Sequence, residues 1–557
     1  MRRLLTFVVL AFCVVQAQND ECSFRKLLNK NTAEAQQLYE RKDFAQSAVL
    51  LEELRGNPKL AQTEDKGVGV LYNLACNYSL LGDKQNALKA LSEAVAAGLA
   101  AADQMQQDSD FANIRQEPEY KALSAVVEAR NKAQQTFWNS PALNTKYRDD
   151  LTEDEKIAGL SRLWSEAKYN FAFFDHVPDL DWDASYLAYL PKVRVTKNTL
   201  DYYRTLAEFY AQLHDGHTAV GYPEQLNDVF GYPALSTRLI EGRVFIDVVR
   251  DPSVKEKGIV PGVEVIAIDG IPVKEYAKTR VAPRISASTP QDLDRRIYEA
   301  NLLGGLKGAP VELTFIDRAG STQNLALPRL TPTETDKLPP APWKRFEFRM
   351  LPGGVAYVAL RTFGNQEIVK EFDAAFPEIQ KSKSLILDVR ENGGGSGNIG
   401  YDILSYLTDK PFLDMQWSTA DYRPAFRAWG RTEQLYEGEP SPVPPHGGTP
   451  YIKPVVVLTS AQTYSAAEDF VVAFDSMKRG TIIGEPTGGS TGQPLIFDLP
   501  GGGYARVCSK HDRYPDGKEF VGIGVQPNVV VHPTIADFRA GRDTVLLAAL
   551  DFLVHKP

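Results

Sequence analysis

The spacing of apolar and polar residues changes several times along this chain of 557 residues. Over residues 31–130 and 134–225, apolar side chains recur every three or four positions, which is typical of amphipathic helices. Over residues 230–330, short runs such as "RVFIDVV" alternate apolar and polar residues and predict strands. Residues 345–555 mix apolar strand-like runs, "SLILDVR" and "PVVVLTS", with helical stretches, which predicts an α/β segment. We therefore expect a multidomain α+β protein with an N-terminal helical region, a helical cap region, a β domain and an α/β core.

The first helical region contains an internal similarity. In "LYNLACNYSLLGDKQNALKALSEAVAAG", small and large residues fall at offsets that let two antiparallel helices pack around a turn at Gly82-Asp83. A weaker copy upstream has its turn near Lys42-Asp43. The pattern resembles tetratricopeptide repeats, which implies a protein partner for residues 31–130. A plain helical hairpin is the alternative.

The β region carries the segment "GIVPGVEVIAIDGIPV", which resembles a PDZ domain. That resemblance implies an exposed strand edge that accepts an extended peptide. The segment "FGYPALS" is the candidate loop for a chain end, although it matches the usual carboxylate-binding loop poorly. A small β-barrel without a ligand is the alternative for residues 230–330.

The chain opens with "MRRLLTFVVLAFCVVQAQ", in which two arginines precede an apolar run and small residues stand at Val15 and Ala17. This pattern predicts a signal peptide over residues 1–17, cleaved after Ala17 and too short to span a bilayer. A retained membrane anchor is the alternative, and bulky Phe12 disfavours a lipoprotein anchor at Cys13. We expect an exported protein, periplasmic or secreted, without a stable membrane span.

The net charge and the cysteine content argue against some classes of function. Loss of the leader removes two arginines and lowers the net charge from −9 to −11, which argues against nucleic acid as a partner. The remaining cysteines are Cys22, Cys76 and Cys508, and no Cys-x-x-Cys occurs. Neither a disulfide scaffold nor a zinc knuckle is therefore indicated.

A serine follows one of the predicted core strands. In "TSAQTYSAAEDF", Ser465 comes after the run "VVVL" and before an apolar helical pattern. It is either a helix cap or a nucleophile, and its own surroundings, "TYSAA", are not a G-x-S-x-G that would decide between the two. The loop "ENGGGSGN" follows another predicted strand and fits no nucleotide-binding motif. Its glycines form either a tight turn or a set of backbone N–H groups beside the serine, as an oxyanion hole requires.

A base for such a serine must come from seven histidines. His217 lies in "DGHT", a turn at the end of a predicted helix, where its side chain can face a cleft. His214 and His217 could also be read as metal ligands, but no H-E-x-x-H or clear third ligand accompanies them. We expect no metal and no cofactor.

Taken together, four segments resemble a known family. "LILDVRENGGG", "TSAQTYSAAE", "GEPTGGSTGQ" and "GIGVQPNVVV" occur in the order and spacing of the tail-specific, or C-terminal processing, serine peptidases. With "LHDGHT" and the PDZ-like segment, the similarity covers about residues 155–535. The resemblance implies that Ser465 is the nucleophile and that the N–H groups of Gly394 and Ala466 form the oxyanion hole.

The sequence departs from the Ser–Lys branch of that family. Where that branch has lysine, "GEPTGGST" has Ser490, so the similarity points to the branch of the tricorn core, which uses a histidine supported by a serine and a glutamate. His217 is the matching base, Gly216 stands where that branch has the serine, and Glu519 is the candidate carboxylate. A neutral histidine suits this role, because it is basic at pH 7 while an unperturbed lysine is protonated.

We therefore expect an exported serine endopeptidase, a hydrolase that cleaves polypeptides without a cofactor. The alternative is a non-catalytic ligand- or peptide-binding protein on the same fold, as in the interphotoreceptor retinoid-binding protein. The presence of both Ser465 and His217 favours catalysis.

Overall fold

The computed structural model describes residue 24 and residues 27–63, 65–340, 343–432 and 434–555. The expected leader, residues 1–17, lies outside these. The chain forms two compact units, Met1–Pro141 and Ala142–Pro557. In the described part of both units, no helix is long and apolar enough to cross a membrane.

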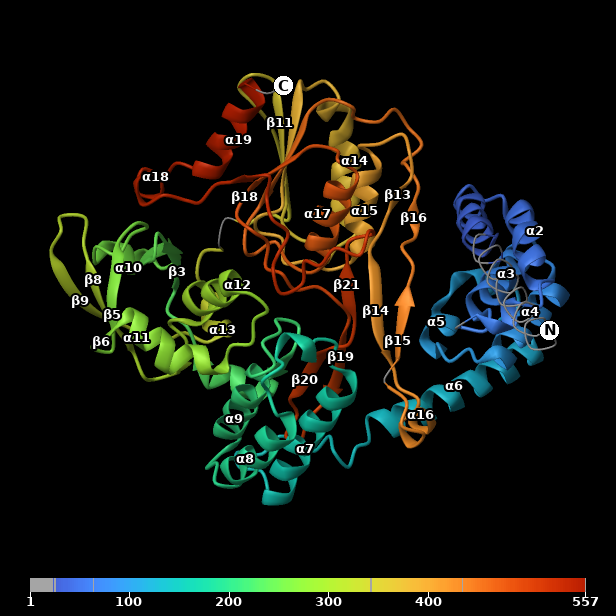
Figure 1. Cartoon of the computed structure of the whole chain (residues 1–557), viewed down its shortest axis with the longest axis horizontal. Coiled ribbons are helices and arrows are strands. Elements are labelled where there is room, and N and C mark those ends of the chain that lie inside the picture. The colour runs from blue at the N-terminus through green and yellow to red at the C-terminus, as the bar shows by residue number, and fades with distance from the viewer. Residues whose placement is uncertain (1–23, 25–26, 64, 341–342, 433, 556–557) are drawn as a thin grey trace, which may run out of the picture. The chain divides into compact units, whose positions relative to one another are not determined.

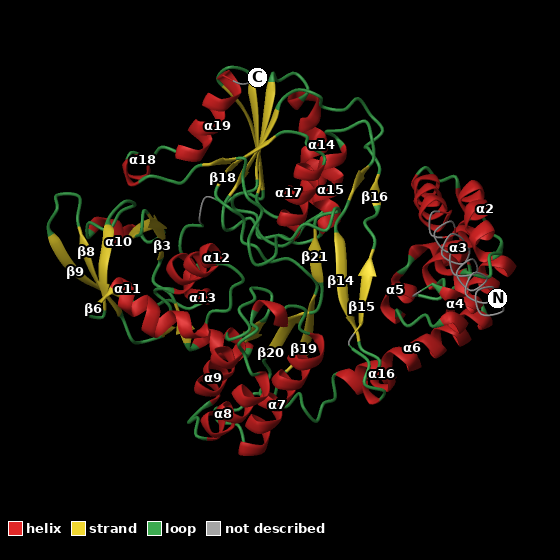
Figure 2. Cartoon of the chain, in the orientation of Figure 1, coloured by secondary structure: helices red, strands yellow, loops and turns green. Residues whose placement is uncertain are grey.

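The first unit is helical (Figures 1 and 2). Residues 27–40 are helical, and the helices that follow are α2 (Phe44–Arg55), α3 (Val68–Leu80), α4 (Lys84–Ala97), α5 (Ala102–Gln107) and α6 (Pro118–Trp138). The predicted turns are present: Asp43 caps α2 and Asp83 caps α4, each accepting a backbone N–H, and Gly82 between α3 and α4 has φ +79°. The helices share one apolar core.

Helix α6 continues past residue 130, the expected end of the first helical region, and runs to Trp138. No glycine or proline interrupts the chain between Pro118 and Trp138, so nothing stops the helix earlier. The helix ends just before Ser140-Pro141, and the second unit begins at Ala142.

The second unit begins with three packed helices, α7 (Glu153–Asn170), α8 (Trp182–Arg194) and α9 (Thr199–Ala211). Aromatic residues fill their interface, where Trp182 stacks on Phe209 at 4.2 Å. A small antiparallel sheet of order β1-β20-β19 lies beside these helices in Figure 1. Its strands are β1 (Ala219–Gly221), β20 (Tyr504–Cys508) and β19 (Pro494–Asp498). Of the expected cap region, residues 134–225, the part from Ala142 onwards therefore joins the C-terminal part of the chain, whereas residues 134–138 belong to α6.

The β region forms one antiparallel sheet of order β3-β4-β5-β8-β9, with β6 paired to β5. The strands are β3 (Leu235–Ile240), β4 (Arg243–Val249), β5 (Glu264–Ile268), β6 (Ile271–Pro272), β8 (Val311–Ile316) and β9 (Thr322–Leu327). The helical elements around it are α10 (Pro252–Glu256), α11 (Val273–Tyr276), η5 (Ala277–Val281), η6 (Ala282–Arg284), α12 (Pro290–Arg295), η7 (Arg296–Asn301) and α13 (Pro332–Thr335). The edge strand β3 packs against η7, and Thr237 Oγ1 donates to the Tyr298 carbonyl.

The core sheet has the order β10-β11-β12-β17-β18-β22 and is parallel from β11 onwards. Its strands are β10 (Phe346–Leu351), β11 (Val355–Leu360), β12 (Ser384–Asp388), β17 (Val455–Thr459), β18 (Thr481–Gly484) and β22 (Val529–Val530). Successive strand residues face opposite sides, and helices cover both faces (Figure 2). One face carries α14 (Glu367–Ile379), α15 (Gly397–Ser405) and α17 (Ala466–Ser476), and the other carries α19 (Thr544–His555).

The remaining elements surround this core. The strands β14 (Gln416–Asp421), β15 (Gln434–Gly438) and β21 (His511–Arg513) form a three-stranded sheet, with α16 (Pro424–Ala428) between the first two. Shorter pieces are β2 (Phe230–Gly231) with β7 (Gly305–Leu306), β13 (Phe412–Leu413) with β16 (Pro442–Val443), and α18 (Ile535–Arg539). Both described cysteines, Cys76 and Cys508, are buried and free.

Candidate active site

Ser465 lies between a core strand and a helix. Strand β17 ends at Thr459, a short loop follows, and Ser465 directly precedes α17. Ser465 is the N-cap of α17 and forms a capping box with Glu468, whose carboxylate accepts from the Ser465 N–H at 3.3 Å. The Ser465 Oγ also lies 3.1 Å from Nε2 of His217, a residue 248 positions earlier in the chain. The geometry therefore gives Ser465 a contact that a helix cap does not need.

The backbone of Ser465 is strained, with φ 56° and ψ −130°. Serine rarely adopts positive φ, and such a conformation costs on the order of 1–3 kcal/mol, which the surrounding structure must offset. The Ser465 N–H donates to the Ser490 carbonyl (3.1 Å), and the Glu468 carboxylate accepts from the same N–H at 3.3 Å. These bonds hold the residue in the conformation that turns its hydroxyl toward His217.

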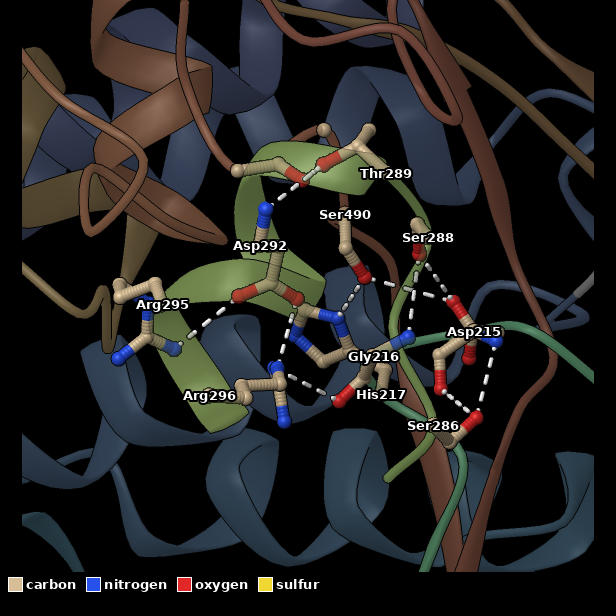
Figure 3. A network of polar contacts seen from close by, with 12 residues as sticks. Asp215, Gly216, His217, Ser286, Ser288, Thr289, Asp292, Arg295, Arg296 and Ser490 are labelled. Atoms are coloured by element: carbon tan, nitrogen blue, oxygen red, sulfur yellow. Dashed lines mark hydrogen bonds and ion pairs between the residues drawn. The ribbon is translucent and has the colours of Figure 1, made fainter. Parts of the chain in front are cut away.

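His217 is held on both ring nitrogens and is only 5% exposed. Its Nδ1 lies 2.8 Å from Ser490 Oγ, and its ring stacks on Tyr464 with the centroids 5.0 Å apart. Ser490 Oγ in turn donates to Asp215 Oδ1 at 3.3 Å. This network assigns the Nδ1–H tautomer, in which Nε2 is free to accept a proton from Ser465. Figure 3 shows the imidazole, Ser490 and Asp215 in this order.

A second loop fixes the segment that carries His217. Ser286 Oγ accepts from the Asp215 N–H and donates to the Asp215 carbonyl, while Ser288 Oγ accepts from the Gly216 N–H (Figure 3). Asp215 Oδ2 accepts from Thr218 Oγ1 at 2.6 Å. With these partners, the turn that ends α9 is held on both sides, so the imidazole has one orientation.

Gly216 leaves no room for a side chain. A Cβ built on it would lie 2.0 Å from the Tyr464 hydroxyl and 2.9 Å from Arg296 Nη2. A serine at this position, as in the tricorn-like branch, would clash with both. The hydroxyl beside the imidazole comes instead from Ser490, in the segment where the Ser–Lys branch carries lysine.

Glu468 supports the same cluster from the first turn of α17. Its buried carboxylate accepts from the N–H groups of Gly489 (2.7 Å) and Ser490 (2.9 Å) and from Thr487 Oγ1 (2.5 Å). With the Ser465 N–H, four donors face this carboxylate. Glu468 therefore ties the loop that carries Ser465 to the loop that presents Ser490.

The glycine-rich loop lies against Ser465. A Cβ on Gly394 would come within 2.7 Å of Ser465 Cβ, and its φ of +94° also favours glycine. The Gly394 N–H donates to Asn392 Oδ1 at 2.9 Å. Among the described residues, no acceptor is found for the Ala466 N–H. Two N–H groups are expected to donate to the oxyanion. Among the described residues, the Ala466 N–H has no acceptor, whereas the Gly394 N–H donates to Asn392 in its own loop.

The structure does not bring Glu519 to this cluster. Its half-exposed carboxylate contacts His511 Nε2 (2.7 Å) and Arg513 Nε (2.6 Å). No hydrogen bond between described residues joins it to His217 or Ser490. The reason is the path of the chain: β21 and the turn after it direct Glu519 back onto the strand that carries His511 and Arg513. The carboxylate that ends the His217 network is Asp215.

Burial sets the protonation states in this cluster. Loss of solvent, and then the nearby Arg506 and Arg296 guanidiniums, lower the pKa of His217 to about 3. Burial raises the pKa of Glu468 to about 7, although its hydrogen-bond donors oppose the shift. Burial also raises the pKa of Asp215. His217 is therefore neutral across the physiological range, and Glu468 is the group of this cluster whose pKa lies near 7.

Three of these residues were not assigned a role from the sequence. In the sequence, Asp215 stands out only as part of a turn, and Ser490 stands out only as the residue that replaces a lysine. No sequence motif assigns a role to Glu468. A carboxylate at the third position after Ser465 is a detectable signal, because a helix N-terminus attracts acidic residues. That signal predicts a cap but not the contacts to residues 487–490.

The class of protein is indicated by the fold and the cluster together. A serine, a histidine and a carboxylate in one hydrogen-bonded network, where a parallel strand meets a helix, form an arrangement typical of serine hydrolases. Residues 354–531 match the model of peptidase family S41.

Two curated relatives agree with this class, and one solved structure shares the fold. The chloroplastic C-terminal processing peptidase of Tetradesmus obliquus is 30% identical over 192 residues, covering 33% of this chain and 38% of the relative. The chloroplastic carboxyl-terminal-processing peptidase 2 of Arabidopsis thaliana is 26% identical over 318 residues, covering 55% of this chain and 53% of the relative. Mature CPAF complexed with lactacystin has the same fold, with a TM-score of 0.60 and 18% identity over 72% of this chain and 98% of that one.

These likenesses support the S41 C-terminal processing peptidase family for this chain. Its similarity spans 38% and 53% of the length of the two curated relatives. The activity, substrates and partners of the whole protein are therefore matters of proposal.

Proposed function

We propose that this chain is an exported serine endopeptidase that cleaves polypeptides, with Ser465 as nucleophile and His217 as general base. The observation that carries the proposal is the network from Ser465 Oγ through His217 to Ser490 and Asp215. The S41 likeness supports the same reaction class. Export is inferred from residues 1–17, and a protein partner for the helical repeats is inferred from their sequence pattern.

In the first half of the reaction, Ser465 Oγ attacks the carbonyl carbon of the scissile peptide bond. His217 Nε2 takes the hydroxyl proton and then gives it to the leaving amine as the C–N bond breaks. In the second half, water attacks the acyl-enzyme, and His217 first accepts the proton of the water and then returns it to Ser465. The Nδ1–H bond to Ser490 keeps the imidazole in the tautomer that both halves require.

Backbone donors stabilise the oxyanion in this proposal. The Ala466 N–H stands at the N-terminus of α17, where the helix dipole favours negative charge. The Gly394 N–H joins it by exchanging its bond to Asn392 Oδ1 for the oxyanion. One such donor contributes on the order of 3 kcal/mol to transition-state stabilisation.

The alternative is a non-catalytic ligand- or peptide-binding protein on the same fold. The strained backbone of Ser465 and its contact with a neutral imidazole favour catalysis, because ligand binding requires neither. Strain of this kind is concentrated at functional sites.

Covalent labelling tests the proposal directly. We expect a fluorophosphonate probe to modify the full chain at one residue, with the adduct found by peptide mapping on the peptide that contains Ser465. The reason is that the probe needs a serine activated by a base and an oxyanion site. Denatured protein is the control and should not react. An adduct on another serine, or no adduct on folded protein, would contradict the assignment.

Replacing Ser490 by alanine should lower kcat on the order of 10²-fold and leave KM nearly unchanged. The hydroxyl lies between His217 Nδ1 and Asp215, so its loss frees the imidazole to rotate and removes an acceptor from Nδ1. Steady-state kinetics with a peptide substrate measure the effect. Ser509→Ala is the matched control, since Ser509 Oγ donates to a carbonyl outside this cluster. An equal loss in both variants would assign a merely structural role to Ser490.

A further inference from the structure

A large cavity of about 1340 Å³ lies beside the candidate active site. Helix α9, β1 and residues 222–236 border it on one side, and α11, η5, η6 and residues 329–336 border it on the other. Small-ligand pockets measure roughly 300–1,000 Å³, so this space is large enough for a longer ligand. Ser465 does not line it. We call it the arginine cavity.

The lining of the arginine cavity is strongly cationic in an acidic protein. Among the described residues that line it are two carboxylates, Glu208 and Asp336, and no lysine. The net charge of the lining is therefore positive, whereas that of the whole chain is −9. Six arginines line it: Arg204, Arg250, Arg280, Arg284, Arg296 and Arg329.

Arg296 pairs with the buried Asp292 at 2.6 Å, but among the described residues three of the six guanidiniums have no carboxylate within 4 Å. Within the described part of the chain, no ion-pair partner within 4 Å is found for Arg250, Arg280 or Arg329. Arg250 donates to the carbonyls of Thr335 (3.0 Å) and Pro339 (3.0 Å), so it is positioned without being neutralised.

Among the six, Arg329 is the clearest example of a buried guanidinium without a carboxylate partner among the described residues. It is only 7% exposed, and it donates to the carbonyls of Leu303 (3.0 Å) and Ala309 (2.7 Å). Arg284 and Arg204 have their nearest carboxylates at 3.8 and 3.9 Å, too far for a hydrogen bond. Burying a cation without an opposite charge is costly, so the cavity favours an anionic ligand.

The position of the cavity connects it to the catalytic loop. Thr218, the neighbour of His217, and Ser286, which holds Asp215, both line it. Arg296 Nη2 donates to the Gly216 carbonyl at 3.3 Å (Figure 3). Strand β1 also lines it, and among the described strands β1 pairs only with β20. Its other edge can hold an extended chain that leads from the cavity to His217.

We propose that the arginine cavity binds acidic side chains of the polypeptide substrate, at a distance from the bond that is cleaved. Guanidinium groups pair with carboxylates through two parallel hydrogen bonds, and tyrosine and phenylalanine rings in the lining pack against the rest of the chain. Nucleic acid does not suit a protein whose overall charge is negative. This inference rests on the proposed peptidase function for its substrate class.

Binding is tested apart from catalysis, in full-length protein carrying Ser465→Ala. The probe is a fluorescent peptide with six consecutive glutamates, and its matched control has six glutamines. We expect fluorescence anisotropy to show binding at least tenfold tighter for the glutamate peptide, with an affinity that falls as salt is raised. Equal binding of the two peptides would overturn the proposal.

Two pairs of substitutions locate the site. Arg280→Gln with Arg284→Gln should weaken binding of the glutamate peptide at least tenfold, whereas Arg349→Gln with Arg423→Gln, outside the cavity, should change it less than twofold. Circular dichroism checks that each variant is folded. An equal effect of both pairs would indicate general charge attraction and overturn the proposal.

Two further measurements distinguish side-chain carboxylates from a C-terminal carboxylate and from small anions. Amidating the C-terminus of the glutamate peptide should weaken binding less than tenfold. A hundredfold loss would assign the cavity to a chain end, and displacement by equimolar inorganic phosphate would assign it to small anions; either result overturns the proposal. The catalytically intact wild-type chain should hydrolyse a neutral peptide. If the wild type fails to do so, the proposed function fails while the binding result stands.

Discussion

Replacing Ser465 by alanine is expected to lower peptide hydrolysis by roughly 10⁴-fold or more while the fold stays intact. The substitution removes one oxygen and keeps Cβ, so the side chain still fits beside Gly394, where an added Cβ would come within 2.7 Å of Ser465 Cβ. The strained φ of 56° is no worse for alanine than for serine, so stability changes little. A fluorogenic peptide assay measures turnover, and thermal unfolding checks the fold.

Ser460→Ala is the matched control for this experiment. Ser460 lies in the same loop, and its hydroxyl donates to the Arg390 carbonyl, away from His217. Its loss should cost about 1 kcal/mol of stability and leave turnover nearly unchanged. If Ser465→Ala retains more than a few per cent of wild-type turnover, with contaminating protease excluded, the nucleophile lies elsewhere.

The second large effect is expected at His217. Its replacement by alanine should lower kcat by about 10²–10⁴-fold, the usual contribution of a general base. His217 is the residue whose Nε2 reaches the Ser465 hydroxyl, so no described side chain replaces it. His214→Asn is the control, because His214 is exposed in the same turn and asparagine tolerates its φ of 48°. Comparable losses in both variants would show that the loop, and not the base, was disturbed.

The pH dependence separates His217 from its neighbour. The sequence alone predicts that kcat/KM rises through pH 6–7 as a histidine loses its proton. In the structure, burial lowers the pKa of His217 to about 3, so its basic form is present throughout that range. Glu468, whose pKa burial raises to about 7, is the group that ionises there, and its carboxylate form accepts all four donors around it.

We therefore expect kcat/KM to rise from pH 6 to 8 because Glu468 loses a proton. Protonation at lower pH removes acceptor capacity and loosens the loop that carries Ser490. In Glu468→Gln, the remaining activity should be flat over this range. An inflection near pH 6–7 that persists in this variant would belong to His217 and contradict its lowered pKa.

Local pattern was enough to predict most of the secondary structure. The apolar runs before Ser465 and before the glycine loop are the buried strands β17 and β12, and the turns at Gly82-Asp83 and Lys42-Asp43 separate helices as expected. Period and turn residues reflect interactions within a few positions, and a single sequence contains these directly. The extent of α6 was missed because no breaking residue marks the expected boundary.

The sequence was sufficient to predict most strands and helices, and its family motifs single out Ser465 and His217 as candidate residues. Their contact depends on the folded chain, because it joins positions 248 apart. In the fold, Ser490 contacts the imidazole, Asp215 accepts from Ser490, and Glu519 lies on His511. The tertiary structure also gathered six arginines that are scattered from position 204 to 329 into one cavity. These contacts depend on how whole helices and strands pack against one another, and the spacing of residues along the chain does not show that packing.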